Sequence, residues 1–145
     1  MVRNCRSVTE TQEFAAELAD SVPAGHVIAL LGNLGSGKTT FAQGFASGLG
    51  IREHVGSPTF KLVSEYAGSP HNLYHVDCYR LQHADDFFNI GGERYLAPEH
   101  AVTLIEWADI ISEVLPKETI IIKFRRSKAE PDTRTITVKG WDLDE

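Results

Sequence analysis

The chain has 145 residues, a formal net charge of −6, and 42% hydrophobic and 23% charged residues. This length and balance suit a soluble protein, and we expect a single domain over residues 1–145. The composition excludes several classes: no apolar run approaches the ~20 residues that span a bilayer, and the polar N-terminus lacks a signal-peptide core. The two cysteines have no metal-like spacing, so we expect a cytoplasmic location with free thiols and no membrane partner.

The first half of the chain predicts a helix, a buried strand and a second helix. A capping-box pair precedes apolar residues at helical spacing, which predicts a helix over Thr9–Asp20. The apolar run His26–Gly32 is rich in Val, Ile and Leu and predicts a fully buried strand. A glycine-rich loop follows, and a helix is expected over Lys38–Leu49, where Gly48 and Gly50 end it.

The second half predicts further strands that alternate with short helices. Thr59–Tyr66 and Asn72–Leu81 alternate like strands, and they form a hairpin or two neighbouring strands. A short helix over Ala84–Asn89 and a buried strand over Val102–Asp109 follow. A short helix before Pro116 and an antiparallel pair of strands, 119–125 with 133–140, close the pattern, which indicates an α/β domain.

The loop between the first strand and the second helix carries a phosphate-binding motif. Gly32, four residues, and Gly37-Lys38-Thr39 match G-x-x-x-x-G-K-[ST]. Glycines let backbone N–H groups approach phosphate oxygens, Lys38 supplies a charge for the β- and γ-phosphates, and the Thr39 hydroxyl is a Mg²⁺ ligand. The candidate nucleotide contacts of the loop are Gly32, Asn33, Leu34, Gly35, Ser36, Gly37, Lys38, Thr39 and Thr40.

A Mg²⁺ ion held in this way needs an acidic partner at the end of a neighbouring strand. Glu106 ends the apolar run VTLIE, at the edge of the sheet where ligands gather, and Asp77 lies in YHVDCYR. Either carboxylate suits the metal, directly or through water, or suits the orientation of the attacking water.

Other polar and aromatic features carry weaker signals. Thr59, in a Ser-Pro-Thr loop, is placed like a switch threonine that senses the γ-phosphate. For Trp107 the pattern alone favours core packing. All six histidines are interpreted as structural or surface residues, because the four-residue spacing of His71 and His75 does not converge in an extended segment. For the basic cluster at 123–128, a solvated strand end and turn is favoured over a binding patch.

The motifs GNLGSGKTTFAQG, SPTF, YHVDCYRL and LIEWAD, in this order, resemble the TsaE family of small bacterial P-loop ATPases. The resemblance implies a P-loop NTPase-like three-layer α/β domain, with a central mixed sheet flanked by helices, and ATP with Mg²⁺ as cofactors. It also implies a partnership with TsaB and TsaD, which transfer threonylcarbamoyl to adenosine 37 of ANN-decoding tRNAs. Contact with tRNA is expected mainly through that complex.

The resemblance also implies roles for individual residues. Lys38, Asp77 and Glu106 are the expected catalytic residues, and Thr39 with Glu106 the expected metal ligands. Trp107 gains a functional role beside the nucleotide. The remaining residues that the resemblance brings to the nucleotide are Thr11, Thr59 and Arg134.

Two alternatives share the phosphate loop. A small-metabolite kinase would need an acceptor pocket and a cationic lid, for which little chain remains. A nucleotide-switched binding module, with incidental hydrolysis, would use the Ser-Pro-Thr loop as its switch. A GTPase is disfavoured, because the guanine-reading N-K-x-D motif is absent.

Overall fold

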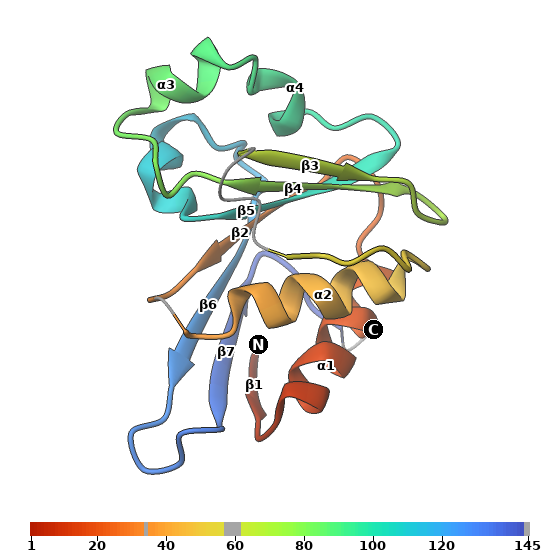
Figure 1. Cartoon of the computed structure of the whole chain (residues 1–145), viewed down its shortest axis with the longest axis vertical. Helices are drawn as coiled ribbons and strands as arrows, with labels where there is room; N and C mark the ends of the chain where they lie inside the picture. Colours follow the sequence, from red (N-terminus) through yellow and green to blue (C-terminus); the bar gives the residue numbers. More distant parts are fainter. Residues whose placement is uncertain (34, 57–61, 144–145) are drawn as a thin grey trace.

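The strands form one mixed sheet in the order β1-β7-β6-β2-β5-β4-β3 (Figure 1). The computed structural model describes residues 1–33, 35–56 and 62–143. The strands are β1 (Val2–Cys5), β2 (Val27–Leu31), β3 (Val63–Tyr66), β4 (Asn72–Asp77), β5 (Ala101–Glu106), β6 (Ile120–Arg126) and β7 (Arg134–Lys139). The helices are α1 (Val8–Ser21), α2 (Lys38–Gly48), α3 (Ala84–Asn89), α4 (Glu93–Leu96) and the 3₁₀ segment η1 (Ala108–Val114).

The four central strands are parallel and the edges are antiparallel. β2 pairs in parallel with β5 and β6, and β4 pairs in parallel with β5. β3, β7 and β1 add antiparallel strands at the two sides. The carboxyl ends of four strands therefore meet at one edge of the sheet, where ligands bind in open α/β folds.

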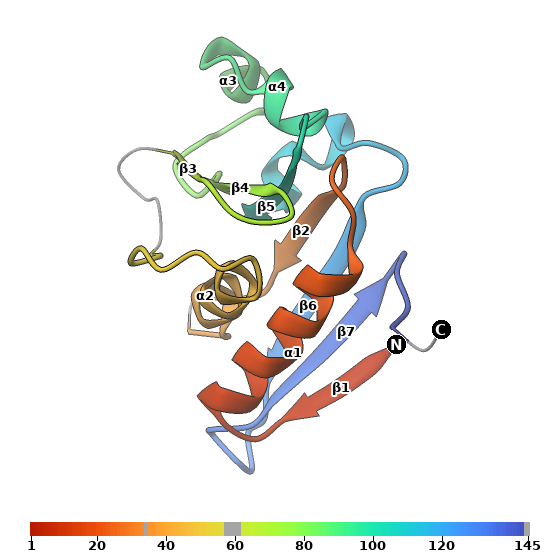
Figure 2. The ribbon, with the colours of Figure 1, turned by 90° about the vertical axis from the view of Figure 1, so that its right-hand side faces the viewer.

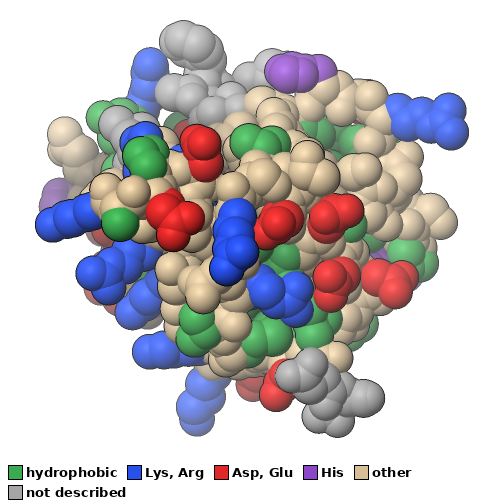
Figure 3. Space-filling view, turned by 90° about the horizontal axis from the view of Figure 1, so that it is seen from below, with side chains coloured by type: hydrophobic (Ala, Val, Ile, Leu, Met, Phe, Trp, Pro, Cys, Tyr) green, Lys and Arg blue, Asp and Glu red, His purple; other side chains and the backbone are tan. Residues whose placement is uncertain are grey.

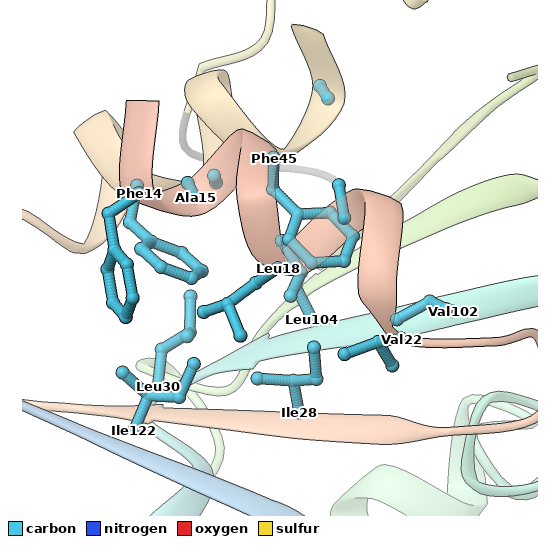
Figure 4. Close-up of a cluster of buried hydrophobic side chains, with 14 of the residues drawn as sticks. Phe14, Ala15, Leu18, Val22, Ile28, Leu30, Phe45, Val102, Leu104 and Ile122 are labelled. Carbon is cyan, nitrogen blue, oxygen red and sulfur yellow. The ribbon is translucent and has the colours of Figure 1, made fainter. Parts of the chain in front are cut away.

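Helices cover both faces of the sheet, which confirms the expected α/β architecture. α1 and α2 lie side by side on one face, and α1 runs along β7 and β1 (Figure 2). Their core contains Phe14, Leu18 and Phe45, which pack on side chains of β2, β5 and β6 (Figure 4). On the opposite face, α3 and η1 cover β2, β5 and β4, with Phe87 and Ile111 in the second core (Figure 1).

α1 and α2 approach each other closely at two glycines of α2. A Cβ built on Gly44 would lie 2.4 Å from Cα of Gln12, and one on Gly48 would lie 2.9 Å from Cα of Ala16. The helix ends at Gly48, in agreement with the predicted stop at Gly48 and Gly50, and Gly48 is also a packing position. These contacts hold α2, whose first turn begins at the phosphate loop, against α1.

Two elements were missed, and β4 and β5 end earlier than predicted; of the predicted strand Thr59–Tyr66, the described residues form β3 only from Val63 onward. β1 is an edge strand of only four residues that pairs with β7 alone and leaves Val2 60% exposed, so it lacks an apolar pattern. α4 is a single turn, too short to show helical periodicity. The predicted strand Val102–Asp109 ends at Glu106, because Trp107 adopts a left-handed conformation at φ 57°. β4 likewise ends at Asp77 rather than Leu81.

The helices of the described ranges contain no segment that is both long and apolar enough to cross a membrane.

Candidate functional site

The loop after β2 has the backbone that its motif predicts. Gly35 and Gly37 have positive φ angles of 75° and 107°, and Gly37 is the N-cap of α2. A Cβ at Gly32 would lie 2.6 Å from Oγ of Ser36 and 2.9 Å from the carbonyl oxygen of Phe124. Glycine is therefore needed at these positions for conformational or steric reasons, and the loop presents backbone rather than side chains at the start of α2.

Lys38 lies at the centre of the site. Its side chain is buried, its Nζ donates to the carbonyl oxygen of Gly32 at 2.6 Å, and it lies 3.9 Å from the ring centroid of Trp107. Burial lowers the pKa of Lys38, whereas the carboxylates of Glu106, Asp77 and Asp109 favour its charged form and oppose this shift. A charged lysine over an aromatic face gains cation–π attraction, so Trp107 helps to hold the ammonium group.

The two predicted acids are neighbours at the carboxyl ends of β4 and β5. Asp77 pairs with Glu106 in the parallel register, and both side chains are buried. Asp77 accepts a hydrogen bond from the backbone N–H of Tyr79 at 2.9 Å. Because Glu106 also pairs with Leu30 on β2, its carboxylate lies beside the strand that leads into the phosphate loop.

His75 binds Glu106 from within the sheet. Its Nε2 lies 2.6 Å from Oε2 of Glu106, and its side chain is fully buried. Because a carboxylate accepts and His75 Nδ1 is buried without a partner, Nε2 is the ring nitrogen that carries a proton toward Glu106. The bond uses one oxygen of the carboxylate and fixes its orientation.

Two adjoining cavities surround this group. The first, of about 450 Å³, is lined by Gly35, Gly37, Lys38, Thr39, Thr40, Asp77, Tyr79, Glu106, Trp107 and Arg134. The second, of about 260 Å³, is lined by Arg6, Ser7, Val8, Thr11, Gly37, Thr40, Asp132 and Arg134. Three residues belong to both cavities, so together they form a continuous surface along the start of α2.

Most of the predicted site residues come together here. The phosphate-loop glycines 35 and 37, Lys38, Thr39 and Thr40 share the first cavity with Asp77, Glu106, Trp107 and Arg134, and Thr11 lines the second. Arg134 Nη2 donates to the carbonyl oxygen of Gly35 at 3.2 Å, which links β7 to the loop. Gly32 takes part through its carbonyl group.

Four predicted contacts lie elsewhere or are not described. Asn33 and Ser36 line neither of these cavities and instead line a third one, on the β6 side of the loop. Leu34 and Thr59 lie outside the described residues, so their predicted roles stay predictions.

Sequence reasoning missed His75 and Tyr79 as neighbours of the acids. His75 was interpreted as structural, and it is buried as that implies, but its partner is Glu106. The two-residue spacing of His75 and Asp77 on one strand was the available signal, because it places both on one face of the sheet. Tyr79 is half exposed and packs on Trp107 with ring centroids 5.0 Å apart, a contact that no local pattern encodes.

The donor set fits Mg²⁺ bound together with a nucleotide better than a metal held by protein alone. Thr39, Asp77 and Glu106 supply oxygen atoms to one cavity, which are the ligands that Mg²⁺ prefers. Within residues 1–33, 35–56 and 62–143, no group of three or more His, Cys, Asp or Glu side chains is arranged to hold a metal. Mg²⁺ in nucleotide sites takes one or two protein ligands and completes its shell with phosphate and water oxygens.

Comparison with known sequences assigns the family. The sequence model for "Threonylcarbamoyl adenosine biosynthesis protein TsaE" matches residues 5–136. The chain belongs to the TsaE family. It is 43% identical over 131 residues to the tRNA threonylcarbamoyladenosine biosynthesis protein TsaE of Bacillus subtilis, covering 90% of this chain and 81% of that protein. It is 39% identical over 120 residues to TsaE of Treponema pallidum, covering 83% and 87%.

A solved structure shows the same fold. The crystal structure of Bacillus subtilis YdiB superposes with a TM-score of 0.76 at 36% identity, over 95% of this chain and 83% of that one. The structural match and the family match both include the phosphate loop and the ends of β4 and β5, because they span nearly the whole chain.

Proposed function

We propose that this protein binds and hydrolyses ATP with Mg²⁺, as a component of the machinery that makes threonylcarbamoyladenosine in tRNA. The observation that carries the proposal is the convergence of Lys38, Thr39, Asp77 and Glu106 on one cavity of about 450 Å³ at the start of α2. The tRNA pathway is taken from the names of the TsaE relatives.

The two cavities divide a nucleotide between them. We place the β- and γ-phosphates in the first cavity, against the loop backbone and Lys38, because the acids that would serve the metal line it. We place the nucleoside toward the second cavity, which Thr11, Thr40 and Arg134 line. The left-handed glycines make this possible, since side chains at these points would separate the phosphates from the backbone.

Each residue has a role that follows from its position. Mg²⁺ would neutralise charge that develops on the phosphate oxygens. Thr39 and Glu106 are the proposed protein ligands of the metal, and Asp77 orients the attacking water. Lys38 leaves the carbonyl oxygen of Gly32 and donates to the phosphates. The acceleration then arises mainly from positioning and charge neutralisation.

The proposed partners are TsaB and TsaD, and the proposed location is the cytoplasm, where the tRNA substrate is. We propose that hydrolysis depends on these partners. The cavity has a volume of about 450 Å³, and the acids, the phosphate loop and the pair Tyr79 and Trp107 that line it come from separate elements, so a partner could bring them closer around the nucleotide. A docked partner would exclude water from the cavity and strengthen the electrostatic interactions inside it.

The test is phosphate release from ATP with and without Mg²⁺. The protein is measured alone, with TsaB and TsaD, and with tRNA added; Lys38→Ala tests the site, and Lys117→Ala is the matched control at an exposed lysine. We expect release that needs Mg²⁺, rises with the partners and is lost only in Lys38→Ala. Hydrolysis unaffected by Lys38→Ala would overturn the site. Transfer of phosphate to a small metabolite would instead identify a kinase, and binding of ATP without turnover in any mixture would identify a switch module.

A further inference from the structure

A third cavity lies on the opposite side of the phosphate loop from the acids. It measures about 350 Å³ and is lined by Asn33, Ser36, Phe124, Arg125, Arg126 and Lys128. β2 lies between β5 and β6 in the sheet, so the loop after β2 has the Glu106 cavity on its β5 side and this cavity on its β6 side. The nucleotide site as proposed does not use it.

The lining of this cavity is built for an anion. It contains three cationic side chains and no carboxylate. The hydroxyl oxygen of Ser36, whose residue is only 4% exposed, is buried in the loop without a hydrogen-bond partner. This hydroxyl is enclosed in the loop beside Gly32, so the three cations and the absence of a carboxylate in the lining are what favour a ligand with acceptor oxygens.

The cationic character extends from this cavity onto an open face of the sheet. Lys123 and Arg125 lie two residues apart on β6 and are exposed, so they share the face opposite α1 and α2. Their antiparallel partners on β7 are Thr137 and Thr135. Thr135 in turn donates to Oδ1 of Asn4 on β1 at 2.9 Å. The result is a row of cations beside a row of hydroxyl and amide groups.

Charge is distributed unevenly over the molecule. Figure 3 shows Lys and Arg side chains along the left of a view from the end where β6 joins β7, and a group of Asp and Glu side chains to the right. Since the chain has 20 acidic and 14 basic residues, a local excess of cations is not a consequence of composition. The turn between the two strands carries the acids Glu130 and Asp132, and neither lines the third cavity.

We propose that the β6–β7 face, together with the third cavity, binds the sugar–phosphate backbone of RNA. Cations two residues apart on a strand are roughly 6.5 Å apart, a spacing that suits consecutive phosphates of a single strand. Hydroxyl and amide groups are the other common partners of phosphate oxygens. The described face lacks the buried aromatic anchors of a protein interface, which favours RNA over a protein partner. That this RNA is tRNA rests on the proposed function; the recognition of phosphate does not.

The experiment measures binding of a fluorescein-labelled, unmodified tRNA transcript to the full chain by fluorescence anisotropy over a series of salt concentrations. The test variant is Lys123→Glu with Arg125→Glu, and Lys123→Gln with Arg125→Gln serves in case the charge reversal disturbs the pairing of β6 with its neighbours. The matched control is Arg52→Glu with Lys117→Glu, which changes the net charge equally at exposed sites outside this face.

We expect both β6 variants to weaken tRNA binding about tenfold or more at low salt, and the control to change it less than threefold. The slope of log K against log salt should become shallower by roughly 1 for each cation removed. Affinity for ATP, measured by calorimetry, should stay the same, because neither residue lines the nucleotide cavities. If the β6 variants bound tRNA as the wild type does while ATP hydrolysis was intact, the RNA-binding inference would be wrong and the proposed ATPase function would stand.

The proposal would be overturned if the β6 variants bound tRNA with the affinity and salt slope of the wild type. If the same variants then bound TsaB and TsaD more weakly, this face would be a protein-docking surface.

Discussion

His75 Nε2 lies 2.6 Å from Oε2 of Glu106, and both side chains are buried where β4 and β5 end. The fully buried histidine holds the Glu106 carboxylate from its interior side. Partners of this kind orient the ligands of a metal and change its affinity when they are removed.

We expect His75→Ala to raise the Mg²⁺ concentration needed for half-maximal ATP hydrolysis about tenfold. Tenfold is the lower end of the range for hydrogen-bond partners of metal ligands. The alanine leaves Glu106 without the group that orients it, whereas the side-chain amide of His75→Gln can still donate. Hydrolysis is titrated with Mg²⁺, and circular dichroism verifies the fold. Equal Mg²⁺ requirements in wild type and His75→Ala would show that this hydrogen bond serves packing only.

Glu106→Ala should abolish ATP hydrolysis, with a loss of at least about a hundredfold, because a preorganised charge at the reaction centre is removed. Thermal unfolding of the variant is recorded alongside phosphate release to establish that the protein is folded. Glu118→Ala is the matched control, since Glu118 is an exposed glutamate that lines neither nucleotide cavity. Wild-type turnover in a folded Glu106→Ala protein would refute its assignment as a metal ligand.

Trp107 offers a direct signal of nucleotide binding. Its ring lies 3.9 Å from Nζ of Lys38, and the proposed movement of Lys38 to the phosphates would remove this contact. In a Trp141→Phe background, where Trp107 is the single tryptophan, MgATP should change the emission intensity or wavelength. Adding Lys38→Ala should remove the response. A response of equal size in that variant would show that the change in Trp107 emission does not arise from movement of Lys38.

Gly44→Ala should lower the free energy of unfolding by about 1–3 kcal/mol, because its Cβ would lie 2.4 Å from the backbone of Gln12. Helix propensity alone would favour alanine by roughly 1 kcal/mol, so the overlap with α1 has the larger effect. Ser47→Ala is the control, at an exposed position of α2. Urea unfolding of both variants decides the matter, and stabilisation by Gly44→Ala would contradict the close packing.

The two thiols should be unreactive in the folded protein. Both are buried, and burial raises the pKa of Cys78 to about 12 and also raises that of Cys5. A raised pKa keeps the thiol protonated at pH 8, where the reactive thiolate would otherwise be appreciable. A thiol reagent such as DTNB should therefore label neither residue at pH 8 until urea unfolds the chain. Rapid labelling of the native protein would show that one thiol is accessible.

The sequence by itself determined the features that depend on short stretches. The strand before Gly32, the loop and the start of α2 at Lys38 were predicted correctly, because a buried strand, conformationally special glycines and a helix each leave a local pattern. The same is true of the antiparallel closing pair β6 and β7. The end of β5 at Glu106 could not be predicted from the local pattern, because the apolar residues continue past it. The strand stops there because Trp107 adopts a left-handed conformation.

The tertiary structure alone decided which side chains meet. Asp77 and Glu106 are 29 positions apart, and the parallel register of β4 and β5 places them together. That register also brings His75 to Glu106, and strand order puts Asn33 and Ser36 on the β6 side of the loop, away from the acids. A local pattern records how a segment folds on itself, whereas partners from distant segments are chosen by strand order and register, which the packing of the whole chain sets.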